Sequence, residues 1–197
     1  MIAILDYGSG NLRSALRAFE TTGRKVFITA DAETAEKADA LVVPGVGAFG
    51  ACMDGLKKVN GDQIVKARVT AGKPTLGICV GMQIMFESGV EHGTFIGIGA
   101  LKGTVEKMSA PVLPHMGWNT VQTYGASKLF SGIENESFYF VHSYAVKNSD
   151  VAVRATSNYC GDFISAIEDG PITATQFHPE KSGAAGLKLI SNWVESL

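Results

Sequence analysis

Short apolar runs alternate with helical repeats through the first half of the chain, and this alternation restricts the fold more than any other feature. A helix is expected after Asn11, whose side chain suits the N-cap position, and it should end at Gly23. Strands separated by helices predict βαβ units and therefore a mostly parallel sheet. The strands are expected at 2–5, 26–28, 41–43 and 75–78, and the second and third runs are typical of strands buried on both faces.

The second half has a different pattern, because strand-like runs follow one another from about residue 97 to 176 without clear helices between them. Such runs predict antiparallel additions to the same sheet or a small second sheet. The runs lie at 101–106, 138–146, 151–155, 163–167 and 172–177, with loops expected around Pro111, Pro114 and Gly125. A last helix is expected from the apolar spacing of Ile190, Trp193, Val194 and Leu197.

The fold class expected from both halves is α/β, with a mostly parallel central sheet flanked by helices and extended by antiparallel strands. A chain of 197 residues favours one domain, covering residues 1–197. Seventeen basic against nineteen acidic residues give a net charge of −2, so no basic surface is offered to nucleic acid or to an anionic membrane. No apolar run approaches the roughly 18 residues of a membrane helix.

The N-terminus and the cysteines indicate the compartment. Asp6 comes early and no basic stretch precedes an apolar one, so residues 1–10 are interpreted as a first strand and not as a signal peptide. The three cysteines, Cys52, Cys79 and Cys160, are too few and too scattered for a disulfide framework or a zinc site. We expect a cytoplasmic protein with free thiols and no metal or cofactor.

The sharpest local motif is Gly-Ile-Cys-Val-Gly at residues 77–81, between the expected strand at 75–78 and a helical pattern at 82–86. This is the arrangement of a nucleophile elbow, with sulfur in place of a hydroxyl. The turn around Cys79 can close only if the residues two positions away on either side are small. The N–H of Val80 would face the sulfur at a helix N-terminus, where partial positive charge favours a thiolate.

A nucleophilic sulfur needs a base, and His178 is the best placed of the four histidines. Pro179 biases His178 toward extended geometry, in which Glu180 projects to the same side. A carboxylate on one ring nitrogen leaves the other to exchange a proton with sulfur. Cys79 alone could be a small buried residue and His178 alone a surface residue. Together they favour catalysis.

The remaining candidates have less support as catalytic or metal-binding groups. His115 and His142 lack His or Cys partners at ligand spacing, and we expect them to be hydrogen-bonded or interface residues. Cys52 and Cys160 have no elbow and no nearby base, so they are interpreted as structural.

The loop Pro-Gly-Val-Gly at 44–47 follows an expected strand and offers a second backbone donor for an oxyanion, worth about 3 kcal/mol in a transition state. Residues 45–50 also match the dinucleotide pattern G-x-G-x-x-G. That interpretation needs an acidic residue about 20 positions on, and residues 65–71 contain none. Nucleotide binding is therefore disfavoured.

At this point the chain resembles a known family. The stretches 77–83 and 178–180 are similar to those of class I (triad) glutamine amidotransferases, and 6–11, 44–50 and 114–119 look like the glutaminase subunits of imidazole glycerol phosphate synthase. The resemblance implies that the chain hydrolyses glutamine through a thioester without a cofactor. It also implies a heterodimer in which a (β/α)₈-barrel cyclase subunit takes up the ammonia.

The resemblance also implies individual roles. Cys79 attacks the glutamine amide, His178 moves the proton to the leaving ammonia, and Glu180 orients His178. An oxyanion hole is implied at Val46, Gly47 and Val80, with a peptide flip in that loop left open. Substrate binding is implied at Gly45, Gln83, Glu91, Ser143 and Tyr144, and the partner interface at Asn11, Trp118, Asn119 and Lys181.

Several alternatives stay open. Glu91 could be a solvated loop charge, and Trp118 could be a core residue. The chain could serve another synthase, for pyridoxal phosphate or anthranilate, or be a stand-alone cysteine hydrolase. A non-enzymatic binding module is a further class, which the intact residues Cys79, His178 and Glu180 argue against.

Overall fold

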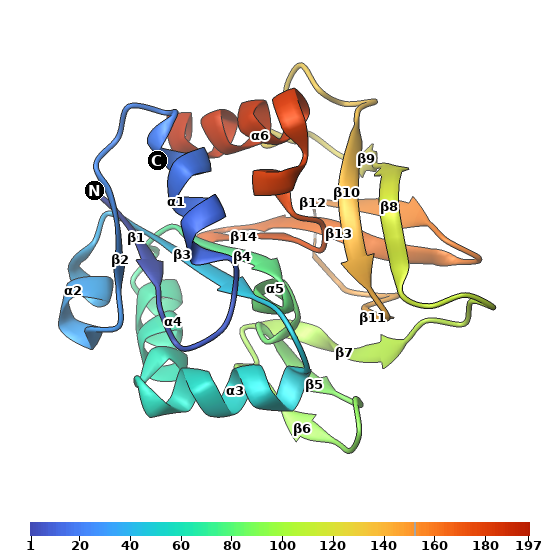
Figure 1. The fold of residues 1–197 in the computed structure, drawn as a ribbon, viewed down its shortest axis with the longest axis horizontal. Helices are drawn as coiled ribbons and strands as arrows, with labels where there is room; N and C mark the ends of the chain where they lie inside the picture. The colour runs from blue at the N-terminus through green and yellow to red at the C-terminus, as the bar shows by residue number, and fades with distance from the viewer. Residues whose placement is uncertain (152) are drawn as a thin grey trace.

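The computed structural model describes residues 1–151 and 153–197, and it is built around one eight-stranded sheet (Figure 1). The first five strands in the sheet are mutually parallel and the last three are antiparallel additions. The order across the sheet is β2 (Val26–Thr29), β1 (Ile2–Leu5), β3 (Ala40–Gly45), β4 (Thr75–Cys79), β14 (Ile172–Thr175), β13 (Asp162–Asp169), β12 (Val153–Asn158) and β9 (Gln122–Tyr124).

Helices cover both faces of the parallel part. Figure 1 shows α1 (Leu12–Glu20) and α6 (Gly183–Glu195) on one face, and α3 (Phe49–Lys58) and α4 (Gly61–Thr70) on the other, with α2 (Ala32–Lys37) against α4. Strands β1 and β3, which lie between these layers, are apolar and fully buried. The hydrophobic core therefore lies on both faces of the central strands.

Two smaller sheets lie at the end of the molecule opposite the N-terminus (Figure 1). One pairs β10 (Ser137–His142) with β8 (His115–Thr120) in antiparallel fashion. The other has the order β11 (Tyr144–Ala145), β7 (Leu101–Lys107), β5 (Phe86–Gly89) and β6 (Phe95–Ile96). The sequence left open whether the second half extends the main sheet or forms another, and the chain does both.

The mostly parallel α/β architecture expected from the sequence is confirmed, but two local predictions are wrong. β2 lies at one edge of the sheet and is only half-buried, so it is not covered on both faces. The helical pattern at 82–86 also fails, because α5 spans only Val80–Gln83 and Phe86 begins β5. The carbonyls of Ile84 and Met85 accept hydrogen bonds from Ile98 and Leu101, respectively, and these sheet contacts end the helix.

Some strand boundaries also differ from the prediction. Strands β8 and β9 occupy a region where loops were expected around Pro114 and Gly125. The run 138–146 is interrupted at Ser143, which separates β10 from β11. The run 151–155 corresponds to β12, which continues to Asn158, with residue 152 outside the described residues. The run 172–177 ends at Thr175, and Leu197 lies exposed beyond α6.

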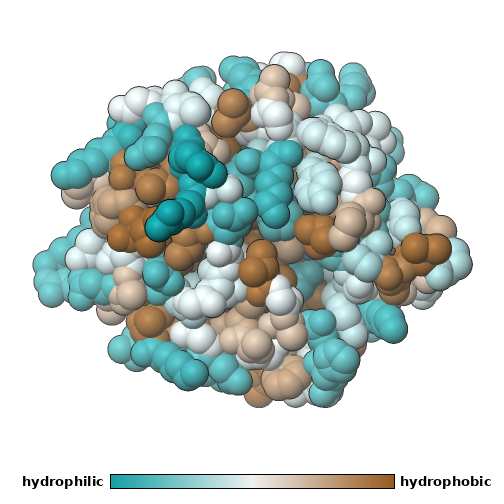
Figure 2. All heavy atoms as spheres, in the orientation of Figure 1, coloured by the Kyte–Doolittle hydropathy of each residue, from teal (hydrophilic) through white to brown (hydrophobic). Residues whose placement is uncertain are grey.

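On the surface, hydrophilic residues are interspersed with several separate groups of hydrophobic ones, as Figure 2 shows for one face. Within residues 1–151 and 153–197, no helix combines the length and the apolar character needed to cross a membrane.

Arg68 of α4 is a buried charge that holds the edge of the fold together. Its side chain is fully buried, and its guanidinium donates hydrogen bonds to five backbone carbonyls. Four of these carbonyls lie at or just after α2, and the fifth precedes β4. They belong to Ala35, Glu36, Ala38, Asp39 and Pro74.

We expect Arg68→Met to lower the free energy of unfolding by about 3 kcal/mol, because buried carbonyls lose their donors. Urea denaturation followed by circular dichroism measures the change. Lys66→Met on the exposed side of the same helix is the control, and it should change stability by less than about 0.5 kcal/mol. Equal effects of the two substitutions would contradict the role given to Arg68.

Candidate active site

Cys79 ends β4 in a backbone conformation that L-residues rarely adopt, with φ 57° and ψ −113°. Two glycines make this turn possible. A Cβ atom added to Gly81 would lie 1.8 Å from the Val43 carbonyl oxygen, and one on Gly77 would lie 2.7 Å from the Gly81 oxygen. The requirement for small residues around Cys79 is therefore confirmed, and its cause is close approach of α5 to β3.

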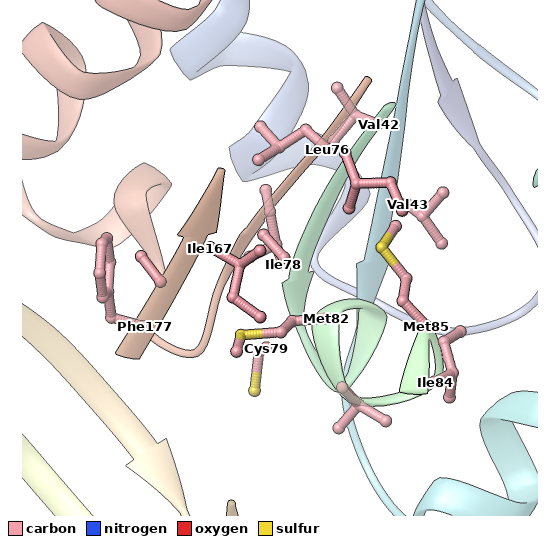
Figure 3. Packing of buried hydrophobic residues seen from close by; sticks show 14 of the residues in the cluster. Val42, Val43, Leu76, Ile78, Cys79, Met82, Ile84, Met85, Ile167 and Phe177 are labelled. Carbon is pink, nitrogen blue, oxygen red and sulfur yellow. The ribbon is translucent and has the colours of Figure 1, made fainter. Parts of the chain in front are cut away.

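The short helix after Cys79 is packed on both sides, as Figure 3 shows with Met82 directed toward Ile167 and Met85 toward Val43. Because α5 has only four residues, few peptide dipoles add up at its N-terminus. The sequence argument for a helix dipole at the sulfur is correspondingly weakened.

His178 and Glu180 lie just beyond the end of β14 and form a buried pair. The Nδ1 atom of His178 lies 2.8 Å from Oε1 of Glu180, and both side chains are at least 97% buried. His178 is extended, as Pro179 was expected to impose. Glu180, however, belongs to a 3₁₀ turn, η1 (Pro179–Lys181), so this turn brings the carboxylate to the ring.

Strand β10 fixes the backbone of the His178 turn. The His178 N–H donates to the Tyr139 carbonyl at 3.0 Å, and Ser182 Oγ donates to the His178 carbonyl at 2.6 Å. Ser182 Oγ in turn accepts from the Tyr139 N–H at 3.0 Å. Phe177, fully buried, stacks on Phe138 of β10 with ring centroids 4.3 Å apart. These contacts set which way the His178 ring faces.

The electrostatics of His178 favour its charged form. Burial lowers the pKa of His178, but hydrogen bonding and charge attraction from the Cys79 sulfur and the Glu180 carboxylate raise it by more, to about 10. The Nε2 atom is buried and has no hydrogen bond of ordinary geometry within the described chain. The ring therefore has one nitrogen engaged by a carboxylate and one available on the side of the sulfur.

Cys79 and His178 line one cavity of about 370 Å³. The residues predicted to bind substrate or an oxyanion line it too, except Gly45, and the third predicted catalytic residue, Glu180, is buried behind His178 and does not line it. Those that do are Val46, Gly47, Val80, Gln83, Glu91, Ser143 and Tyr144, together with Lys181 from the expected interface.

The 44–47 loop is held from behind by the first loop of the chain. The Val46 N–H donates to Ser9 Oγ at 2.9 Å, and Ser9 Oγ donates to the Val46 carbonyl at 2.8 Å. Cys52 Sγ also lies 3.3 Å from that carbonyl. In this conformation the Val46 N–H is engaged by Ser9 and not by the cavity. Sequence reasoning assigned Ser9 no role of its own.

Gln83 is buried and joins two other residues of the site. Its amide nitrogen donates to the Tyr144 carbonyl at 2.8 Å and to Oε1 of Gln176 at 3.1 Å. The amide nitrogen of Gln176 lies 3.9 Å from the Cys79 sulfur. Sequence reasoning missed Gln176, although in an extended chain it shares a side with His178, two residues on. Glu91 accepts a hydrogen bond from the N–H of Phe49 at 2.8 Å, at the start of α3.

The four residues expected at a partner interface are carried by neighbouring elements, and Lys181 is the one among them that also lines the cavity. α1 packs on η1, η1 packs on β10, and β10 pairs with β8. Trp118 is 59% exposed, which excludes a core position. Asn11 caps α1 by accepting from Ser14 N, and Asn119 donates to the Asn158 carbonyl. Lys181 is exposed beside the cavity.

Known proteins match both the sequence and the fold of this chain. Residues 3–196 match the family described as Glutamine amidotransferase class-I. The chain belongs to this family. Relatives named "Imidazole glycerol phosphate synthase subunit HisH" are 55% identical in Mycolicibacterium paratuberculosis and 51% in Thermobifida fusca, each covering all of this chain and 98% of the relative.

Solved structures share the fold of this chain at low sequence identity. One titled "Crystal structure of glutamine amidotransferase" has a TM-score of 0.77 at 18% identity, with 98% of each chain covered. Another, "Structure of PurLQS from Thermotoga maritima", has a TM-score of 0.77 at 19% identity, covering 99% of this chain and 97% of that one.

This amidotransferase has no candidate metal centre in the part of the chain that the structure describes, since no group of three His, Cys, Asp or Glu side chains comes together there. The His115 and His142 side chains are hydrogen-bonded to each other, as one of the two sequence interpretations expected.

We expect Gly81→Ala to cost about 3 kcal/mol of folding free energy, because the added methyl group meets the rigid Val43 carbonyl. Gly50→Ala is the matched control, since its methyl group meets only the ring of Phe95, and a cost of about 1 kcal/mol is expected. Thermal unfolding of both variants measures the difference. Equal losses of folding free energy in the two variants would show that the contact between α5 and β3 does not determine the conformation of the turn at Cys79.

The raised pKa of His178 predicts a pH dependence. The pKa of His178 in the folded chain lies above the ordinary value of 6.5, so protonation of the ring stabilises the fold. This stabilisation is complete below pH 6.5 and is lost as the pH rises through about 10. In an NMR titration, the His178 ring should not titrate between about pH 5 and 8. Glu180→Gln should lower the pKa of His178, because the ring loses its carboxylate partner, and Glu195→Gln on the surface should leave it unchanged. A wild-type midpoint near 6.5 would contradict the coupling.

Proposed function

We propose that this chain is the glutaminase subunit of an imidazole glycerol phosphate synthase, formed by a single domain of residues 1–197. It hydrolyses glutamine to glutamate and ammonia in histidine biosynthesis. The observation that carries the proposal is one cavity lined by a cysteine at a strained strand-to-helix turn and by His178, whose ring is paired with the buried Glu180. Full-length relatives above 50% identity support the choice of synthase.

The reaction begins with proton transfer between Cys79 and His178. The thiolate attacks the side-chain amide carbon of glutamine, and a carbon–sulfur bond forms while the carbonyl becomes an oxyanion. The His178 imidazolium, oriented by Glu180, then gives its proton to the departing nitrogen, and ammonia leaves. Water, deprotonated by His178, attacks the remaining thioester and releases glutamate.

The oxyanion is held by backbone donors. Val80 follows the nucleophile directly and supplies the first N–H. The second comes from the loop at Val46 and Gly47, whose glycine has a positive φ of 92° and so tolerates a change of peptide orientation. Release of the Val46 N–H from Ser9 is the step that completes this hole.

The polar end of glutamine lies against the remaining cavity wall. The backbone of Ser143 and Tyr144 faces it and is held in place by Gln83. Glu91 and Gly45 complete the substrate site. Glu91 has the charge to attract the α-ammonium group, and one of its oxygens already accepts from the α3 backbone. Gly45 permits close packing of the loop, because a Cβ there would lie 2.5 Å from Gly81 N.

Ammonia is passed to a (β/α)₈-barrel cyclase subunit, which makes imidazole glycerol phosphate and aminoimidazole carboxamide ribonucleotide. The docking face comprises Asn11, Trp118, Asn119 and Lys181, with Trp118 as the exposed aromatic anchor.

A cytoplasmic location is part of the proposal, because the chemistry needs a reduced Cys79 and reducing compartments keep thiols free.

The direct test is glutamate production by the purified chain, alone and with the cyclase subunit and its nucleotide substrate. Turnover should rise with the partner, and Cys79→Ala should lower it by about 10³-fold or more. Cys160→Ala, at an exposed cysteine, is the matched control and should retain full activity.

Two outcomes would redirect the assignment. Stimulation by a pyridoxal phosphate or anthranilate synthase partner instead of the cyclase would change the pathway and keep the chemistry. Ester or peptide hydrolysis by the isolated chain, without stimulated glutamine turnover, would favour a stand-alone cysteine hydrolase.

A further inference from the structure

Two buried histidines on the small β8–β10 sheet form a direct contact that the proposed mechanism does not use. His115 and His142 lie opposite each other in the antiparallel pairing, and His115 Nδ1 is 3.1 Å from His142 Nε2. Both are at least 94% buried. Aromatic rings surround them, with His115 stacked on Tyr159 at 4.2 Å and His142 beside Phe163 at 4.9 Å.

The outer partners of this pair determine where its hydrogens lie. His142 Nδ1 is 3.0 Å from the Tyr144 carbonyl, which can only accept, so Nδ1 carries the hydrogen and Nε2 has a lone pair. His115 must then donate from Nδ1 and accept at Nε2. Asn119 supplies that donor, because its amide nitrogen lies 3.3 Å from His115 Nε2 and 2.9 Å from the Asn158 carbonyl.

All hydrogens in this chain of contacts therefore point one way, from Asn119 through His115 and His142 to the Tyr144 carbonyl. A proton added to either ring would place two N–H groups face to face or displace Asn119. The surroundings agree with neutral rings, since burial lowers the pKa of His142 to about 3 and nearby His115 and His178 act in the same direction. Burial also lowers the pKa of His115.

The Tyr144 carbonyl connects this pair with the nucleophile. It accepts one hydrogen bond from His142 and another from Gln83, at 3.0 and 2.8 Å. Gln83 also donates to Gln176, whose amide nitrogen approaches the Cys79 sulfur. Tyr144 begins β11, directly after the break at Ser143, and it lines the cavity together with Ser143 and His142.

We propose that His115 and His142 are positioning residues for glutamine binding. As a neutral pair with fixed tautomers, they tie β8, the strand that exposes Trp118, to the Tyr144 carbonyl. They thereby hold the Ser143–Tyr144 backbone in the orientation that receives the polar end of the substrate. This inference rests on the proposed glutaminase function, because it assigns the pair an effect on glutamine affinity.

Steady-state kinetics of the complex with the cyclase separate positioning from general stability. His142→Phe keeps a planar ring but removes the donor to Tyr144, and we expect KM for glutamine to rise about 10-fold while kcat changes less than about threefold. His142→Asn places an amide N–H near the position of Nδ1 and should recover most of the affinity. Phe163→Leu disturbs the same aromatic cluster without touching the hydrogen bonds, so it should lower Tm and leave KM unchanged.

Nitrogen-15 NMR of labelled histidines tests the tautomers without any need for turnover. In the wild-type chain, His142 and His115 should each carry the hydrogen on Nδ1 and stay neutral at pH 7. His115→Phe should leave the hydrogen of His142 on Nδ1, because the Tyr144 carbonyl still accepts it. A cationic His142 or a hydrogen on Nε2 would overturn the proposal. The proposal would also be overturned by an unchanged KM for glutamine in His142→Phe, or by a KM in His142→Asn as high as in His142→Phe. An equal rise of KM in Phe163→Leu would overturn it as well.

These outcomes are distinguishable from failure of the proposed function. A wild-type complex that hydrolyses no glutamine refutes the glutaminase assignment, whereas an active wild type with an equally active His142→Phe variant refutes only the positioning role.

Discussion

The close approach of the first turn of α5 to strand β3 is the constraint on which the site depends. Gly81 lies so near the Val43 carbonyl that no side chain fits between them, and this contact holds the chain in its sharp turn at Cys79. The cysteine is thereby placed at the carboxyl end of β4, between the ends of β3 and β14. In parallel sheets this edge is where ligands bind, because loops from neighbouring strands converge there.

The opposite wall of the site depends on the antiparallel half of the chain. β10 binds the His178 turn through Tyr139 and packs its phenylalanines on Phe177, so the small sheet positions the base. The same strand carries His142, which reaches the Tyr144 carbonyl. β8 pairs with β10 along its whole length and exposes Trp118 on its outer side. A partner that moved β8 would therefore act on both the base and the substrate-facing backbone.

The elements that the sequence predicted are those whose physical cause is local. Short β-branched runs between helical repeats predicted the parallel strands. Glycine spacing around Cys79 predicted the elbow, because part of the crowding there is within the turn, between Gly77 and Gly81. Pro179 likewise predicted the extended geometry of His178.

What the sequence could not predict depends on contacts between distant segments. β5 replaces an expected helix because residues 98 and 101 take the carbonyls that a helix would use. The bond of Ser9 to Val46 joins residues 37 positions apart, and the Gln83–Gln176 contact joins residues 93 apart. The His115–His142 pair similarly requires the register of two strands that no local pattern specifies.

The central claim is that the Cys79 sulfur, with His178 beside it, forms a covalent bond to the substrate. Acid quenching of the complex during glutamine turnover, followed by peptide mass spectrometry, tests this claim most directly. The account predicts a γ-glutamyl thioester on the peptide that contains Cys79, which hydroxylamine removes, and none on Cys52 or Cys160. Steady turnover with an unmodified Cys79, or with the label on another residue, would contradict it.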